Sequence, residues 1–312
     1  MNTLFIVSGL ILLILGGNWL LKSAVSISLR MHIPKIVIGM TVVSFATSAP
    51  ELIVSVKSAL NGFPDLAMGN VVGSNVANLG LVLAVTIMLS RIEVEKSFYK
   101  TDWPIMMISS CMLYGFVVTD HVLQRYEGIV LVVFLVVFLV YLLRVQKPAV
   151  VSDEASNNEE AMSALKTSSL LLLGGLALWG GSELLISGAV GMAEFYGVSR
   201  RVIAVTVVSI GTSVPELAAS IIAVVKKEKA ISLGNLIGSN MFNILAVLGI
   251  TSIIQPIAVN DKGLLTNDMY WMLGISFVIF PLVFMPKKMQ LGWREGIVLL
   301  LLYLGFVATT LL

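Results

Sequence analysis

The chain has 312 residues, of which 57% are hydrophobic and 12% are charged, whereas a soluble domain carries about 25% charged residues. This composition excludes an ordinary soluble domain and indicates an integral membrane protein. A net charge of +2 without a basic stripe gives no support to nucleic-acid binding, and a single cysteine excludes an intramolecular disulfide framework and argues against a thiolate metal centre.

Ten apolar segments follow one another, and runs of about 20 apolar residues are typical of membrane-spanning helices. The first five lie near 3–29, 36–60, 66–90, 102–119 and 126–143. The second five lie near 167–196, 201–225, 230–255, 268–285 and 294–311. Between the two groups, residues 144–166 are polar and charged, which is typical of a flexible linker. We therefore expect two five-helix units, 1–143 and 167–312, joined by this linker.

Two phrases occur twice in the chain at one offset of 165 residues. TVVSFATSAPEL at 41–52 matches TVVSIGTSVPEL at 206–217, and GNVVGSNVAN at 69–78 matches GNLIGSNMFN at 234–243. Because five helices per copy is an odd number, the second copy must cross the membrane in the opposite sense. The sequence predicts an all-α integral membrane protein whose ten transmembrane helices form two inverted-topology repeats, an arrangement in which transporters bind substrate near the midplane. A plain duplicated structural bundle is the alternative.

The distribution of lysine and arginine predicts the orientation, because cytoplasmic loops are enriched in both. With the N-terminus outside, fourteen of these residues fall on the inner side and five on the outer side, with Lys22 inside the first segment. We expect both termini to be extracytoplasmic and the 144–166 linker to be cytoplasmic.

Each copy places one glutamate, Glu51 or Glu216, inside an apolar stretch, and an ionisable group at membrane depth by default marks a functional site. Helical spacing puts hydroxyl residues on the face of each glutamate, and the next segment adds a serine and an asparagine four residues apart. In the first copy these residues are Ser44, Thr47, Ser48, Ser55, Ser74 and Asn78, with Asn70 one turn away. In the second copy they are Ser209, Thr212, Ser213, Ser220, Ser239 and Asn243, with Asn235 one turn away.

Oxygen-only ligands suit Na⁺, Ca²⁺ or Mg²⁺ and not zinc or copper, and a loose cavity suits Ca²⁺ better than Mg²⁺. Pro50 and Pro215 precede the glutamates, and a proline inside a helix removes the usual partner of the carbonyl four residues earlier. The freed carbonyls of Ala46 and Gly211 are further candidate ligands. The alternative for each proline is a simple helix kink.

The paired phrases TSAPE…GNVVGSNVAN and TSVPE…GNLIGSNMFN resemble the two α-repeats of the cation/Ca²⁺ exchanger superfamily, which includes the sodium/calcium exchangers and their prokaryotic relatives. The resemblance covers nearly the whole chain. It implies that helices 1 and 6 slide together across the other eight to alternate access. It also implies cation ligands at Glu51, Thr47, Ser48, the carbonyl of Ser44, Ser74, Asn78, Glu216, Thr212, Ser213, the carbonyl of Ser209, and Ser239. Many sodium/calcium exchangers carry an aspartate where this chain has Asn243, which reduces the available site charge to two and puts a three-sodium stoichiometry in doubt.

The leading hypothesis is a secondary antiporter that exchanges Ca²⁺ for Na⁺ at Glu51 and Glu216. A Ca²⁺/H⁺ antiporter that uses the same glutamates is the first alternative, and a cation channel is the second. No nucleophile–histidine pair or cofactor loop supports an enzyme, and we expect no prosthetic group. The expected partners are the transported ions and the lipid bilayer of a prokaryotic cell (inner) membrane, in which we expect the chain to function as a monomer.

Overall fold

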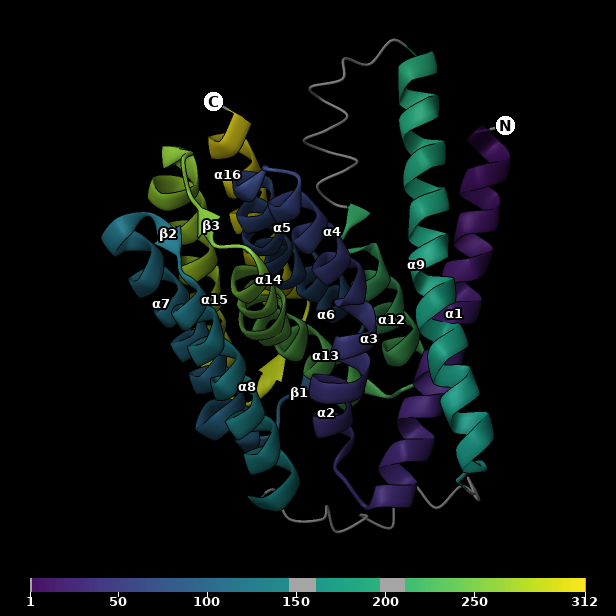
Figure 1. Ribbon diagram of the computed structural model, residues 1–312. Coiled ribbons are helices and arrows are strands. Elements are labelled where there is room, and N and C mark those ends of the chain that lie inside the picture. The colour runs from purple at the N-terminus through teal and green to yellow at the C-terminus, as the bar shows by residue number, and fades with distance from the viewer. Residues whose placement is uncertain (1, 146–160, 197–210, 312) are drawn as a thin grey trace.

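The computed structural model describes residues 2–145, 161–196 and 211–311, and Figure 1 shows how the helices are arranged. The α-helices of the first half are α1 (Asn2–Met31), α2 (Lys35–Ile38), α3 (Ser44–Thr47), α4 (Ala49–Leu60), α5 (Pro64–Ala77), α6 (Leu83–Leu89), α7 (Trp103–Asp120) and α8 (Arg125–Val145). Those of the second half are α9 (Ala164–Phe195), α12 (Val214–Val225), α13 (Lys229–Phe242), α14 (Gly249–Ile254), α15 (Met269–Phe284) and α16 (Trp293–Leu311). Turns of π-helix connect several of them: η1 (Gly39–Val43), η2 (Asn78–Val82), η3 (Phe98–Asp102), η6 (Asn243–Leu248) and η7 (Leu264–Asp268).

The protein is a multi-pass membrane protein built from helices. Within the described ranges, eight helical spans are long and apolar enough to cross a bilayer, and the bent pair Lys35–Thr47 and Ala49–Leu60 makes a ninth. The seventh segment expected from the sequence is represented by the 12-residue α12, because its residues 201–210 lie outside the described ranges. Most of the linker, 146–160, also lies outside them. The count of ten helices and the inverted relation of the halves therefore remain predictions.

The first signature phrase is not one continuous helix. The helix stops at Ser48 (φ −87°, ψ 1°), and α4 starts again at Ala49 with a bend of 44°. Pro50 explains the break, because a proline fits the first turn of a helix, where its missing N–H has no helical partner. Ser213 precedes α12 with nearly the same dihedral angles (φ −90°, ψ 4°), and Pro215 lies in the first turn there.

The two spans that carry the GN…N phrases form the centre of the molecule. About 78% of the α5–η2–α6 span and 83% of the α13–η6–α14 span are buried, against 28–33% in the other six continuous spans. The outer helices expose leucine, isoleucine and valine side chains, as expected for surfaces that face lipid. The polar residues of the central spans are therefore enclosed by protein.

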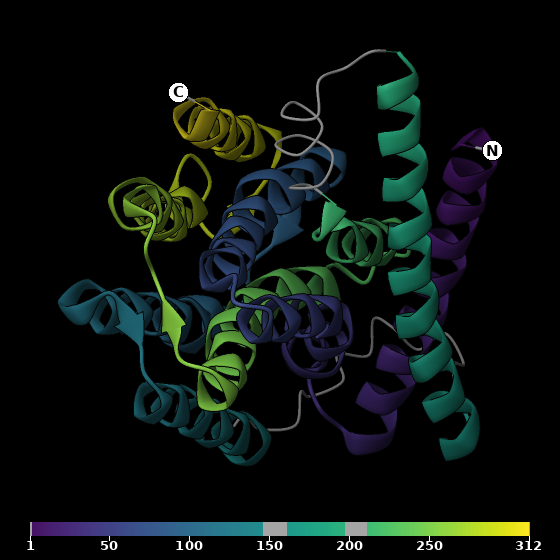
Figure 2. The ribbon, with the colours of Figure 1, turned by 45° about the horizontal axis from the view of Figure 1, so that its top comes forward.

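Helices α1 and α9 pack against each other along one edge of the bundle, where both ribbon views show them side by side (Figures 1 and 2). Glycines permit the close approach: a Cβ on Gly16 would lie 2.8 Å from the Leu178 nitrogen, and a Cβ on Gly174 would lie 2.7 Å from the Leu20 nitrogen. Small residues at a membrane helix interface allow backbones to come this close.

Two short antiparallel ribbons link the halves. Strand β1 (Ile92–Glu93) pairs with β4 (Gln290–Leu291), and β2 (Val122–Leu123) pairs with β3 (Ile257–Ala258). Figure 1 places β1 and β3 toward opposite ends of the bundle, although both follow the central span of their own half.

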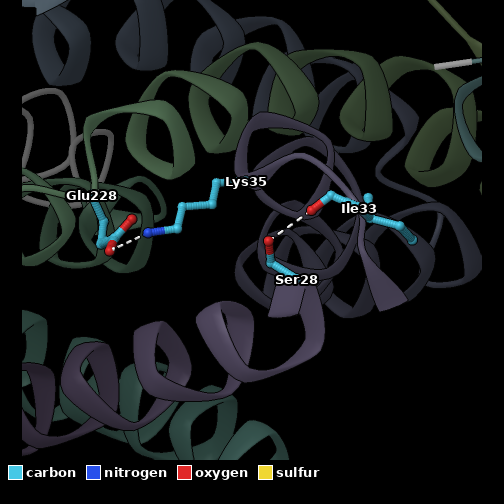
Figure 3. A network of polar contacts seen from close by, with 4 residues as sticks. All are labelled: Ser28, Ile33, Lys35 and Glu228. Carbon is cyan, nitrogen blue, oxygen red and sulfur yellow. Dashed lines mark hydrogen bonds and ion pairs between the residues drawn. The ribbon is translucent and has the colours of Figure 1, made fainter. Parts of the chain in front are cut away.

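An ion pair also joins the halves at the start of α2. Lys35 Nζ lies 2.7 Å from Glu228 Oε1, and Glu228 is the residue that precedes α13. Beside it, the Ser28 hydroxyl near the end of α1 donates to the Ile33 carbonyl at 2.7 Å (Figure 3). These contacts fix how the chain leaves α1 and enters the first signature phrase.

Candidate functional site

The two glutamates lie at equivalent places, each in the first turn of a helix. Glu51 is in the first turn of α4 and Glu216 in that of α12, and both side chains are fully buried. A helix N-terminus carries partial positive charge, so it stabilises a carboxylate at that position. The two carboxyl groups influence each other electrostatically, and the Thr47 and Ser48 side chains lie close to Glu216. The structure thus brings both acids into one buried region.

Hydrogen bonds connect the hydroxyl residues of one half to those of the other. Thr47 Oγ1 lies 3.3 Å from Ser239 Oγ, and Ser74 Oγ lies 3.2 Å from Thr212 Oγ1. Thr47 also donates to Asn235 Oδ1 at 3.2 Å. The four helices that the sequence expects around the site therefore meet there, with α3–α4 and α5 from the first half and α12 and α13 from the second.

Several buried oxygens at this place have no hydrogen-bond partner. Within the described part of the chain, fourteen buried side-chain oxygens are unpartnered, and eight of them belong to the residues expected from the sequence. Those eight are Ser48 Oγ, Glu51 Oε1 and Oε2, Asn78 Oδ1, Ser213 Oγ, Glu216 Oε1 and Oε2, and Asn243 Oδ1. Buried polar groups are normally paired, so unpaired ones call for an explanation. A bound hard cation would explain these unpaired oxygens, because Ca²⁺ takes about 6–8 oxygen ligands.

Asn78 and Asn243 begin the π-helical turns η2 and η6. Such turns occur frequently at functional sites. Asn78 Nδ2 donates to Asn240 Oδ1 at 3.3 Å, and Asn243 Nδ2 donates to Asn75 Oδ1 at 3.0 Å. Asn75 and Asn240 end the repeated GSN triplets and are not among the ligands expected from the sequence.

Two hydrogen bonds hold the glutamate helices against the central spans. Asn70 Nδ2 donates to Ser55 Oγ at 3.0 Å, and Asn235 Nδ2 donates to Ser220 Oγ at 3.3 Å. Each bond joins a central span to the glutamate helix of its own half. These serines are therefore occupied by the neighbouring asparagine.

The Ser44 hydroxyl is already used, because its single proton lies between two acceptors, the Gly39 carbonyl at 2.8 Å and the Asn235 carbonyl at 2.9 Å. The Ser44 carbonyl, which the resemblance implies as a ligand, accepts the Ser48 backbone N–H at 2.9 Å. The Gly211 carbonyl accepts the Ser182 hydroxyl of α9 at 2.9 Å. The Gly211 carbonyl still has a second lone pair for a cation. It does, however, have a hydrogen-bond partner, whereas the position of Pro215 predicts that it has none. Ser209 lies outside the described residues.

One buried acid was missed by the sequence analysis. Asp102, the last residue of η3, has no exposed surface, and neither of its carboxylate oxygens has a hydrogen-bond partner. It lies close to Ser97 and Glu95. The only available signal was its position at the start of an apolar segment, which resembles an ordinary helix end.

The family model for "Sodium/calcium exchanger protein" matches residues 1–144 and 167–312 of this chain. The chain belongs to this family. The match leaves out only the region expected to be the linker, and it confirms the resemblance inferred from the paired phrases. The family is one of membrane exchangers, which agrees with the expectation that the chain is not an enzyme.

This exchanger-family chain is similar over nearly its full length to several known proteins. CaxA of Alkalimonas amylolytica, named as a candidate antiporter, is 36% identical over 310 residues, which cover 97% of each chain. The sodium/calcium exchanger MaX1 of Methanosarcina acetivorans is 28% identical and covers 98% of this chain and 97% of its own. Among solved structures, the sodium-calcium exchanger NCX_Mj, soaked with zero Na⁺ and Ca²⁺, superposes with a TM-score of 0.83 at 27% identity over 98% of both chains.

Proposed function

We propose that this chain is a secondary antiporter that exchanges Ca²⁺ for Na⁺ by alternating access. The observation that carries the proposal is the group of eight unpartnered buried oxygens around Glu51 and Glu216. Two carboxylates match the charge of one Ca²⁺ or two Na⁺. Hydroxyl and amide oxygens supply the remaining ligands without adding charge.

The energetic cost of buried charge gives a reason for obligatory exchange. With no cation bound, the two carboxylates are buried in protein, and an unpaired buried charge is expensive. The halves therefore rearrange readily only when cations neutralise the site. Transport in one direction then requires a returning cation, which distinguishes the antiporter from a channel.

The neutral oxygens favour Na⁺ over H⁺ as the counter-ion. A proton needs only the carboxylate, whereas Na⁺ needs a shell of oxygens such as Ser48, Ser213, Asn78 and Asn243 provide. The names of MaX1 and NCX_Mj describe sodium/calcium exchangers, and NCX_Mj was soaked with combinations of Na⁺, Ca²⁺ and Sr²⁺. The Ca²⁺/H⁺ antiporter remains the alternative, because protons can neutralise the same two glutamates.

We also propose that the two halves, 1–143 and 167–312, are inverted repeats. Strands β1 and β3 follow the central spans of their own halves yet lie toward opposite ends of the bundle in Figure 1, which supports this. Both termini are extracytoplasmic and the 144–166 linker is cytoplasmic in a prokaryotic inner membrane, as the charge distribution indicates. The chain functions as a monomer, since one chain supplies both glutamates.

The test is substitution of the two acids. Glu51→Gln and Glu216→Gln each remove one charge from a buried ion site, which costs about 3 kcal/mol, or about 100-fold in affinity. We expect each variant to abolish Na⁺-driven uptake of isotopic Ca²⁺ into liposomes while it stays folded.

Glu127→Gln is the matched control. Glu127 is also a nearly buried glutamate in the first turn of a helix, and its Oε2 accepts the Gln124 N–H at 2.8 Å. A glutamine preserves that cap. Wild-type uptake in Glu51→Gln would contradict the proposal. Uptake driven by a pH gradient and not by a Na⁺ gradient would favour the Ca²⁺/H⁺ alternative.

A further inference from the structure

Four asparagines form a crossed network between the two central spans. Asn78 of the first half donates to Asn240 Oδ1 of the second, and Asn243 of the second donates to Asn75 Oδ1 of the first. All four side chains are at most 1% exposed. The network therefore obeys the same pseudo-symmetry as the glutamates, with each half fixing an amide of the other.

The orientation of Asn75 and Asn240 is set by what surrounds their NH₂ groups. Asn75 Nδ2 donates to the Asn240 carbonyl at 3.2 Å and lies 3.9 Å from Met272 Sδ. Asn240 Nδ2 lies 4.0 Å from Met106 Sδ. Both NH₂ groups thus face acceptors, so the amide oxygens of Asn75 and Asn240 remain for the neighbouring asparagine.

This arrangement determines which atom Asn78 and Asn243 present to the site. Their NH₂ groups are taken by Asn240 and Asn75, and their Oδ1 atoms are left buried and unpartnered. A flipped amide would turn an N–H toward the place where a cation must bind. An oxygen in that position is a ligand, whereas an N–H repels the cation.

We propose that Asn75 and Asn240 are positioning residues that aim the amide oxygens of Asn78 and Asn243 at the transported cation. The inference rests on the proposed function, because it takes Asn78 and Asn243 as cation ligands. Asn75 and Asn240 do not touch the cation in this account.

The acceptor that faces residue 243 explains why an amide suits this position. Asn75 Oδ1 needs a donor there, and turning Asn75 over would set its Oδ1 against the Asn240 carbonyl instead. An amide at position 243 supplies both the donor for Asn75 and an oxygen for the cation.

The experiment compares Asn75→Leu and Asn240→Leu with wild type in Na⁺-driven uptake of isotopic Ca²⁺. Leucine has a similar volume but offers no acceptor to the amide of Asn243 or Asn78. We expect the Ca²⁺ KM to rise about tenfold, the effect of losing one buried hydrogen bond, with a smaller change in kcat.

Ser110→Ala is the matched control, because Ser110 is buried in α7 and its hydroxyl bonds only to the Met106 carbonyl of its own helix at 3.0 Å. Folded Asn75→Leu and Asn240→Leu variants with wild-type KM would overturn the inference and leave the exchanger function intact. A wild-type protein that carries no Ca²⁺ would instead remove the proposed function itself.

Asn75→Ser provides a test that does not depend on the leucine variants folding. Serine is smaller and keeps a polar group, but its side chain is too short to offer an acceptor to Asn243 Nδ2, so the Ca²⁺ KM should again rise. A folded Asn75→Ser variant with the wild-type KM would overturn the inference.

Discussion

At the scale of single residues, the protein tolerates buried acids for different reasons. Glu51 and Glu216 lie at helix N-termini beside other unpartnered oxygens, in a place where a cation can compensate them. Asp102 is equally buried, and its neighbours are Ser97 and Glu95. Asp65 is only partly buried and is well satisfied, because its Oδ1 accepts the N–H groups of Asn260 and Asp261.

This contrast predicts opposite effects of the same chemical change. Asp102→Asn replaces a buried carboxyl group whose oxygens have no hydrogen-bond partner, and Ser97 is near enough to accept from the new amide, so we expect an unchanged or higher Tm. Asp65→Asn weakens charge-assisted bonds to backbone N–H groups and should cost about 1–2 kcal/mol. Thermal unfolding of the purified variants in detergent measures both. A Tm for Asp102→Asn well below that of the wild type would show that the carboxylate has a stabilising partner.

At the scale of elements, the α1–α9 pair is packed through glycines and lies at the edge of the bundle (Figures 1 and 2). The resemblance implies that these two helices slide as a unit during alternating access. Such a unit must hold together internally while it moves against the rest. The backbone contacts at Gly16 and Gly174 provide that internal packing without long side chains between the helices.

Two glycine substitutions in α9 separate packing from helix propensity. Gly174→Ala would place its Cβ 2.7 Å from the Leu20 nitrogen and 3.0 Å from the Gly16 carbonyl oxygen, so the helices must separate. A Cβ at Gly180 would meet no atom of another element within 4 Å among the described residues, so Gly180→Ala should gain up to about 1 kcal/mol of helix propensity. We expect a lower Tm and slower Ca²⁺ exchange for Gly174→Ala only. Equal Tm values in the two variants would contradict close packing at Gly174.

At the scale of the whole molecule, the charge of the site sets the coupling to the membrane potential. Two carboxylates and neutral amides at positions 78 and 243 match the exchange of one Ca²⁺ for two Na⁺, which moves no net charge. Moving one elementary charge across 100 mV would be worth about 2.3 kcal/mol. Exchange that moves no net charge does not depend on this electrical energy.

We therefore expect Na⁺-driven Ca²⁺ uptake to change little when a potential of about 100 mV is imposed across sealed liposomes with a potassium gradient and an ionophore. One net charge per cycle would allow the potential to shift the transport equilibrium by up to about 50-fold. A Ca²⁺-driven current corresponding to one or more charges per cycle would exclude the electroneutral stoichiometry.

The sequence nominates most of the candidate site, because the repeated phrases place polar residues at helical spacing inside apolar segments. Composition indicates a membrane protein, and the shared offset of 165 residues identifies equivalent positions such as Glu51 and Glu216. Both properties are local or periodic, so they can be read without knowing how the helices pack. The family match confirms the exchanger assignment derived from those phrases.

The tertiary structure decided which of these polar atoms are free. Ser44 and Ser48 share one predicted helix face, yet the Ser44 hydroxyl is bound to the Asn235 carbonyl and the Ser48 hydroxyl is left unpartnered. The direction of the Asn78 amide likewise depends on Asn240, which lies 162 residues further along the chain. A hydrogen-bond partner is determined by whichever element packs alongside, and that information is absent from the local spacing of residues.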